Sequence, residues 1–148
     1  MTRPTDIDPF QEYVDRGNVR EMSPDPSQAS NLMASAKRKF ENMERLGLSE
    51  KTATDYLENT YEAVKMLVQA FMALDGYNPY SHEAIIAYGL DHLDLTAEEA
   101  NRFNKFRKLR NDISYRGDMA TIDEAREVRD LFEQLSDRLE PRLEEKLP

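Results

Sequence analysis

The sequence predicts an all-α domain, built as an antiparallel up-and-down bundle of four or five helices. Apolar residues recur with the 3.6-residue period of an amphipathic helix along most of the chain. No segment shows the sustained alternation of apolar and polar residues that is typical of a strand. Cap and turn residues separate the periodic segments at short intervals, so successive helices should lie antiparallel. The 148 residues are expected to form a single domain over 1–148.

Two helices are expected before residue 47. Residues 1–22 should form an N-terminal extension, and its short helix within 6–20 should end at Gly17. The second helix is predicted from Pro26 to Leu46, because proline is favoured in a first turn and the following Gly47 favours a helix end.

The third helix is predicted to be the central one. Ser49 can cap its start alone, and the run from Gly76 to Pro79 should end it. Its apolar stripe is the best in the chain and is widened by two neighbouring residues, which indicates a well-buried helix. The stripe consists of Ala53, Leu57, Tyr61, Val64, Leu67, Phe71 and Leu74.

Two more helices are marked by their caps. Ser81 should begin a short helix that Gly89 ends. Thr96, with Glu99 three residues later, forms a capping-box pattern for the next helix, which should stop before Gly117. The inward residues of the helix that Thr96 caps are expected to be Phe103, Phe106, Leu109 and Ile113.

The last helix is expected over about residues 121–139. Pro141 should kink or end it, because proline removes a helical hydrogen bond. The charged tail 141–148 should fray.

The composition indicates a soluble cytoplasmic protein that needs no cofactor or metal. The chain has no cysteine, which excludes disulfides, cysteine nucleophiles and thiolate metal sites and fits a reducing cytosol. No stretch approaches the 18 apolar residues of a membrane span, and the polar, acidic first nine residues are unlike a signal peptide.

The charge is distributed unevenly. The net charge is −9, and a uniformly acidic protein would repel nucleic acid. Residues 102–116, however, contain six basic residues and one acid, whereas nine acids outnumber five basic residues from 121 onward. Such a basic stretch can neutralise phosphate, and arginine can bind it with two hydrogen bonds. The alternative is a solvated helix face paired with acidic neighbours.

The order of residues within 107–117, Arg-Lys-Leu-Arg-Asn-Asp-Ile-Ser-Tyr-Arg-Gly, resembles the signature of the HEPN family, the nucleotide-binding domains of higher eukaryotes and prokaryotes. That motif is an Arg, usually followed by a polar residue such as Asn, and then a His after four to six intervening residues. Here Arg110 and Asn111 match, and Tyr115 stands at the His position. The resemblance extends to residues 10–17, to the helix after residues 23–25 and to residues 77–88, so it covers most of the chain.

The resemblance implies a HEPN-like bundle that binds a nucleotide or RNA. It leaves two alternatives open, a metal-independent endoribonuclease of the toxin type and a non-catalytic partner of a small nucleotidyltransferase in a toxin–antitoxin-like pair. In many members the motif of one subunit faces the same motif of the other subunit across a dimer interface, so we expect a homodimer. In the enzyme, Arg110 and Tyr115 would be catalytic. The binding residues are expected to be Arg107, Arg110, Asn111, Ser114, Tyr115 and Arg116.

The tyrosine changes the expected chemistry. A His with a pKa near 6.5 can accept and donate protons at neutral pH, whereas a Tyr with a pKa near 10 stays neutral and serves poorly as a base. Tyr115 can still donate a hydrogen bond to phosphate or stack on a base, which favours binding over full nuclease activity. On a regular helix Arg110 and Tyr115 point about 140° apart, so they converge only if the helix loosens near Ser114.

The two histidines, His82 and His92, are expected to be surface or packing residues. A metal site would need further ligands at suitable spacing, and the chain has no His-Glu-x-x-His pattern. Either histidine could replace the missing motif His only if the fold brings it close to the motif. Three tyrosines could form an aromatic wall for a base, although core packing is the more usual role, namely Tyr77, Tyr80 and Tyr88.

Overall fold

The computed structural model describes residues 2–148, and these form six helices and one two-stranded sheet. The predicted helical bundle is confirmed, with six helices instead of the four or five expected, and α2 has the predicted bounds. In chain order the elements are α1 (Phe10–Asp15), β1 (Val19–Glu21), α2 (Pro26–Leu46), α3 (Ala53–Asp75), β2 (Tyr77–Pro79), α4 (His82–His92), α5 (Ala97–Arg116) and α6 (Ile122–Lys146).

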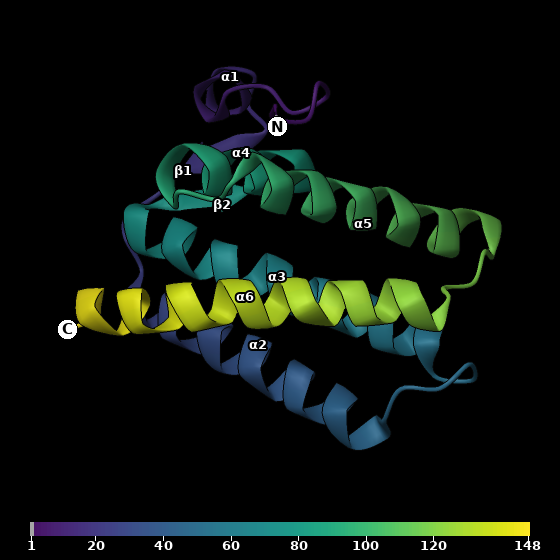
Figure 1. Cartoon of the computed structure of the whole chain (residues 1–148). Coiled ribbons are helices and arrows are strands. Elements are labelled where there is room, and N and C mark those ends of the chain that lie inside the picture. The colour runs from purple at the N-terminus through teal and green to yellow at the C-terminus, as the bar shows by residue number, and fades with distance from the viewer. Residues whose placement is uncertain (1) are drawn as a thin grey trace.

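Four long helices make up the body of the molecule (Figure 1). α2 and α5 run in one direction across the view, and α3 and α6 run in the other. α1, the sheet and α4 lie together beside the N-terminal half of α5. Within residues 2–148, no helix has both the length and the apolar character that crossing a membrane requires.

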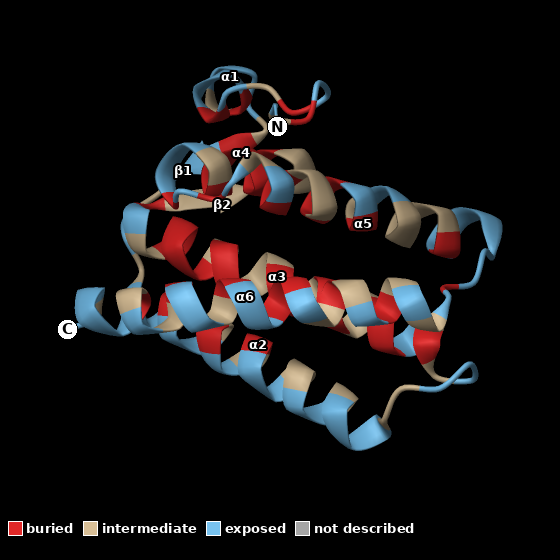
Figure 2. Ribbon diagram, in the orientation of Figure 1, coloured by how far each residue is buried: buried red, intermediate tan, exposed pale blue. Residues whose placement is uncertain are grey.

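α3 is the central helix, as predicted. Buried residues lie along its whole length, whereas α2 buries only one side (Figure 2). Its start corrects the expectation for Ser49, because the helix begins at Ala53 and not directly after a Ser49 cap. The Oγ1 atom of Thr52 accepts a hydrogen bond from the Ser49 backbone N–H at 2.9 Å, so Ser49 belongs to the preceding turn.

The expectation of no strand is wrong. β1 pairs antiparallel with β2, with Val19 opposite Pro79 and Glu21 opposite Tyr77. Each strand has three residues, which is too short for an alternating pattern to be visible in the sequence. The pairing places Gly76 beside the backbone of Met22, whose N–H donates to the Gly76 carbonyl oxygen at 2.8 Å.

Two helices continue past the predicted ends. α4 runs through Gly89 to His92. The missing Cβ of Gly89 leaves room for the side chain of Leu95, which a Cβ would approach to 2.9 Å. α6 runs through Pro141 to Lys146, so the expected fraying of 141–148 is wrong over most of that range. Leu143 is fully buried, and its packing holds the last turns of the helix in place.

The N-terminal extension packs against α4. Its helix is shorter than predicted, and the chain leaves α1 before Gly17. The buried ring of Phe10 meets the rings of Tyr88 and His92 edge-on, with ring centres 5.2 and 5.4 Å apart. Asp91 of α4 binds this segment twice, accepting from the Phe10 backbone N–H at 2.8 Å and from Arg3 at 3.0 Å.

Candidate functional site

α5 carries the basic stretch and begins with the predicted capping box. The Glu99 backbone N–H donates to Oγ1 of Thr96 at 3.1 Å, and the Thr96 N–H donates to the Glu99 carboxylate at 2.9 Å. Gly117 ends the helix with a left-handed φ of 72°. The predicted inward residues Phe103, Phe106 and Ile113 are buried, and Leu109 is partly buried.

Four of the six basic residues of α5 are paired with acids. The amine of Lys105 lies 2.7 Å from Glu127, and that of Lys108 lies 3.1 Å from Asp6. Arg102 pairs with Glu98 at 3.5 Å along the helix. The fourth is Arg107. For these four residues the interpretation as a charge-paired helix face applies.

Arg107 is held inside a network of acids. Its guanidinium contacts Glu83 of α4 at 3.0 Å and Asp6 at 3.2 Å, and its Nε donates to Asn104 at 2.9 Å. Only 12% of its side chain is exposed. Burial raises the pKa of Asp6, but hydrogen bonds from Lys108 and Asn104 outweigh it and lower that pKa overall. Arg107 therefore joins the N-terminal segment to α4 and α5.

Arg110 has a different environment. It lies on the inward face of α5, four residues after Phe106 and three before Ile113, and is partly buried. Its Nε atom is buried and has no hydrogen-bond partner, a state it shares with Arg102, which differs in having an ion pair with Glu98. In the part of the chain that the structure describes, neither Arg110 nor Arg116 forms an ion pair with a carboxylate.

The remaining predicted residues lie at the end of α5. The helix stays regular through Arg116, so it does not loosen near Ser114 as convergence with Arg110 requires. Ser114 and Arg116 are exposed, Asn111 is half-buried, and 86% of Tyr115 is exposed. Arg110 turns inward while Tyr115 faces solvent, and within one chain the two side chains do not come together.

His82 is the histidine that the fold brings to this region. It begins α4, where its Nδ1 lies 3.1 Å from the hydroxyl of Tyr61 and its Nε2 lies 3.5 Å from the amine of Lys65. Burial, followed by the nearby charge of Lys65, lowers the pKa of His82, and the charge of Arg110 lowers it further. Arg110 is thus an electrostatic neighbour of an imidazole that is expected to be neutral at neutral pH.

Sequence reasoning did not find Tyr61 and Lys65. Tyr61 belongs to the predicted core stripe of α3, and its full burial confirms that prediction. Burial and the charge of Glu62 raise its pKa, while Arg107 and Arg110 oppose that rise. Tyr61 and Lys65 are four residues apart on one helix face. No pattern within α3 indicates that α4 would place a histidine against that face.

The other candidates are packing or surface residues. His92 packs against Phe10 and Tyr88, as expected for a packing histidine. Tyr88 is buried in the core and Tyr77 packs against it, whereas Tyr80 is 61% exposed. Over residues 2–148, no three His, Asp or Glu side chains meet in an arrangement that could hold a metal ion.

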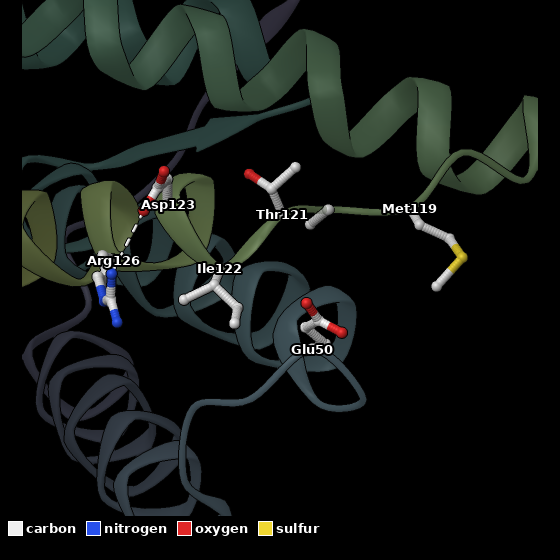
Figure 3. A pocket seen from close by; sticks show the side chains of 7 residues that line it. Glu50, Met119, Thr121, Ile122, Asp123 and Arg126 are labelled. Atoms are coloured by element: carbon white, nitrogen blue, oxygen red, sulfur yellow. Dashed lines mark hydrogen bonds and ion pairs between the residues drawn. The ribbon is translucent and has the colours of Figure 1, made fainter.

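A shallow hollow lies away from these residues, between the start of α3 and the turn from α5 to α6 (Figure 3). Its volume is about 490 Å³, and none of the predicted binding residues lines it. Arg126 and Asp123 pair at its edge at 3.3 Å, and the side chain of Met119 extends into solvent. The lining is formed by Glu50, Met119, Ala120, Thr121, Ile122, Asp123 and Arg126.

The fold and these side chains define a small helical-bundle protein with one unpaired, partly buried arginine on its basic helix. Comparison with family models, with curated proteins and with solved structures finds no match for the chain.

Proposed function

We propose that this chain is a HEPN-like domain that binds the phosphate of a nucleotide or of RNA through the C-terminal half of α5. The observation that carries the proposal is the state of Arg110. Its guanidinium is partly buried, its Nε has no partner, and no carboxylate neutralises it. A buried donor without a partner costs free energy, and phosphate, like carboxylate, is an acceptor that an arginine can bind with two hydrogen bonds.

The surrounding charges indicate that few basic residues of α5 contact the ligand. Because the four basic residues of the N-terminal part of α5 are paired, only Arg110 and Arg116 are free to attract phosphate. Ser114, four residues after Arg110, lies on the same side of the helix and can add a neutral hydrogen bond, and Asn111 offers an amide at the next position around the helix. We therefore expect contact with one or two phosphates and a weak dependence of affinity on salt.

Tyr115 takes a separate role in this proposal. Since it is exposed and turned away from Arg110 in the same chain, it can stack on an unpaired base or reach the Arg110 of a second copy in a homodimer. A homodimer with α5 at its interface would bring the two residues into one site. Light scattering at micromolar concentration tests this part, and a monomer under those conditions would contradict it.

Replacing Arg110 by alanine is expected to weaken the binding of a fluorescently labelled single-stranded RNA by about 10- to 100-fold, the effect of losing one or two charge-assisted hydrogen bonds. Arg110→Lys should recover only part of the affinity, because lysine keeps the charge and loses the forked geometry. Fluorescence anisotropy at low salt measures both.

The matched control is Arg126→Ala, which removes the same charge from an exposed residue of α6. Equal losses in the two alanine variants, or no RNA binding by the unaltered protein, would contradict the proposal. Gel analysis of the same RNA with chelator present separates binding from cleavage. Products that disappear in Arg110→Ala would instead assign the metal-independent ribonuclease.

A further inference from the structure

α3, α4 and α5 meet within the turn of α5 that precedes Arg110, where Arg107 binds Glu83 of α4 at 3.0 Å and the ring of Phe103 lies 5.8 Å from that of Tyr61. The meeting brings together side chains that the binding motif does not contain. We call this group the junction cluster and define it as Tyr61 and Lys65 of α3, His82 of α4, and Arg110 of α5. Tyr61 is buried, Lys65 has 12% of its side chain exposed, and His82 and Arg110 are partly buried. The cluster is thus a polar region at the edge of the core that solvent still reaches.

Hydrogen-bond chemistry favours one position for the proton of His82. The Lys65 ammonium can only donate, so an Nε2 atom without a proton suits its position 3.5 Å away. In that tautomer Nδ1 carries the proton and donates to the Tyr61 hydroxyl oxygen at 3.1 Å. Burial and the charge of Lys65 lower the pKa of His82, which favours the neutral imidazole.

The charges around His82 balance except at one residue. From α3, Glu62 faces the imidazole but is bound to Lys65 at 2.6 Å. From α4, Glu83 also faces the imidazole but is bound to Arg107 at 3.0 Å. From α5, Arg110 contributes a positive charge that no carboxylate offsets. An anion is the one addition that would satisfy Arg110 and also favour a proton on His82.

We propose that the junction cluster is the phosphate-binding part of the site, in which Arg110 and Lys65 bind a phosphodiester of single-stranded RNA and His82 takes up a proton as the RNA binds. The inference rests on the proposed function and deepens it. The bound phosphate replaces the Nε2–Lys65 contact with a hydrogen bond from a protonated His82. Lys65 keeps its ion pair with Glu62 and donates a second N–H to the phosphate, so that donors from three helices surround one anion. No covalent step is involved.

The experiment is a calorimetric titration with a uridine trinucleotide that carries no terminal phosphate. Its diesters and bases do not titrate near neutral pH, so any proton taken up belongs to the protein. Titrations in two buffers of different ionisation enthalpy give the number of protons bound. The expected result is uptake approaching about one proton per RNA, with affinity that rises by up to about tenfold per pH unit between about pH 8 and pH 6.

His82→Asn should keep a hydrogen bond to Tyr61 while abolishing both the proton uptake and the pH dependence. His92→Asn is the matched control, because it removes the other histidine, and it should change neither quantity. Thermal melts verify that both variants are folded. Lys65→Met should weaken binding at every pH.

The outcomes separate the two proposals. No binding of the trinucleotide by the unaltered protein overturns both. Binding that Arg110→Ala weakens, but that shows no proton uptake and the same affinity in His82→Asn, overturns the junction cluster and leaves the proposed function standing. Uptake that persists in His82→Asn also overturns the inference, since another group would then bind the proton.

Discussion

Arg138→Ala is expected to lower the free energy of unfolding by about 3 kcal/mol near neutral pH, because it leaves a buried carboxylate without its charged partner, which is itself 40% exposed. The carboxylate of Glu99 on α5 is fully buried, and Arg138 of α6 donates to both of its oxygens, at 3.0 and 2.7 Å. Without Arg138, the buried charge keeps only Gln134 and the Thr96 N–H as donors. We expect the melting temperature to fall by about 6–12 °C.

The pH dependence of this effect has a definite sign. Burial raises the pKa of Glu99, but the hydrogen bonds from Arg138 and Thr96 outweigh it and lower that pKa overall. A lowered pKa in the folded state contributes stability above the pKa of the unfolded chain, and this contribution disappears as the pH falls through the folded pKa. The difference between Arg138→Ala and the unaltered protein should therefore shrink below about pH 4.5.

Urea unfolding at neutral pH and in acid measures this difference. Arg126→Ala again serves as the control, because its pair with Asp123 is exposed, with 57% and 93% of the two side chains accessible. It should change the unfolding free energy by less than about 0.5 kcal/mol at either pH. A loss in Arg138→Ala that is equally small, or that grows in acid, would contradict the role assigned to this ion pair.

Gly76→Ala should destabilise the protein by about 3 kcal/mol, because two costs add at this position. Gly76 ends α3 with a left-handed φ of 88°, a conformation that costs other residues about 1–2 kcal/mol. A Cβ would also lie 2.5 Å from the backbone oxygen of Met22, and the paired strands hold that oxygen in place. Chemical denaturation reports the change.

Gly117→Ala separates these two costs. Gly117 has a left-handed φ of 72°, and a Cβ there would meet nothing within 4 Å. The Gly117→Ala variant should therefore lose only the conformational part of the unfolding free energy, about 1 kcal/mol. If both variants lost the same amount, the close approach of Met22 would contribute nothing to the effect at Gly76.

The helices could be predicted because their signals are local. The proline in the first turn of α2 and its Gly47 end gave the bounds of that helix, and the capping box of Thr96 located the start of α5. The errors came from residues whose role is decided by distant contacts. Gly89 and Pro141 are normally helix breakers, but α4 and α6 continue through them, with Leu95 packed against Gly89 and Leu143 buried two residues after Pro141.

The same distinction between local signals and distant contacts applies to the candidate site. The basic character of α5 and the spacing of Arg110, Asn111 and Tyr115 could be read from the chain. Whether each cation is paired with an acid could not be read from the chain. Arg107 is neutralised by acids from residue 6 and from α4, while Arg110, three residues later, has no acidic partner. The placement of His82 between Tyr61 and Lys65 depends on three helices that are separate in the sequence.

By itself, the sequence determined that this is a helical bundle with a central α3 and a basic helix ending at Gly117, because periodicity and caps act within a few residues. Only the tertiary structure decided which cations are free, which helices pass through their breakers, and that the charge of Arg110 acts on His82 while Tyr115 faces solvent. Those outcomes depend on packing between helices, which brings together charges from segments far apart in the chain and determines which of them are neutralised.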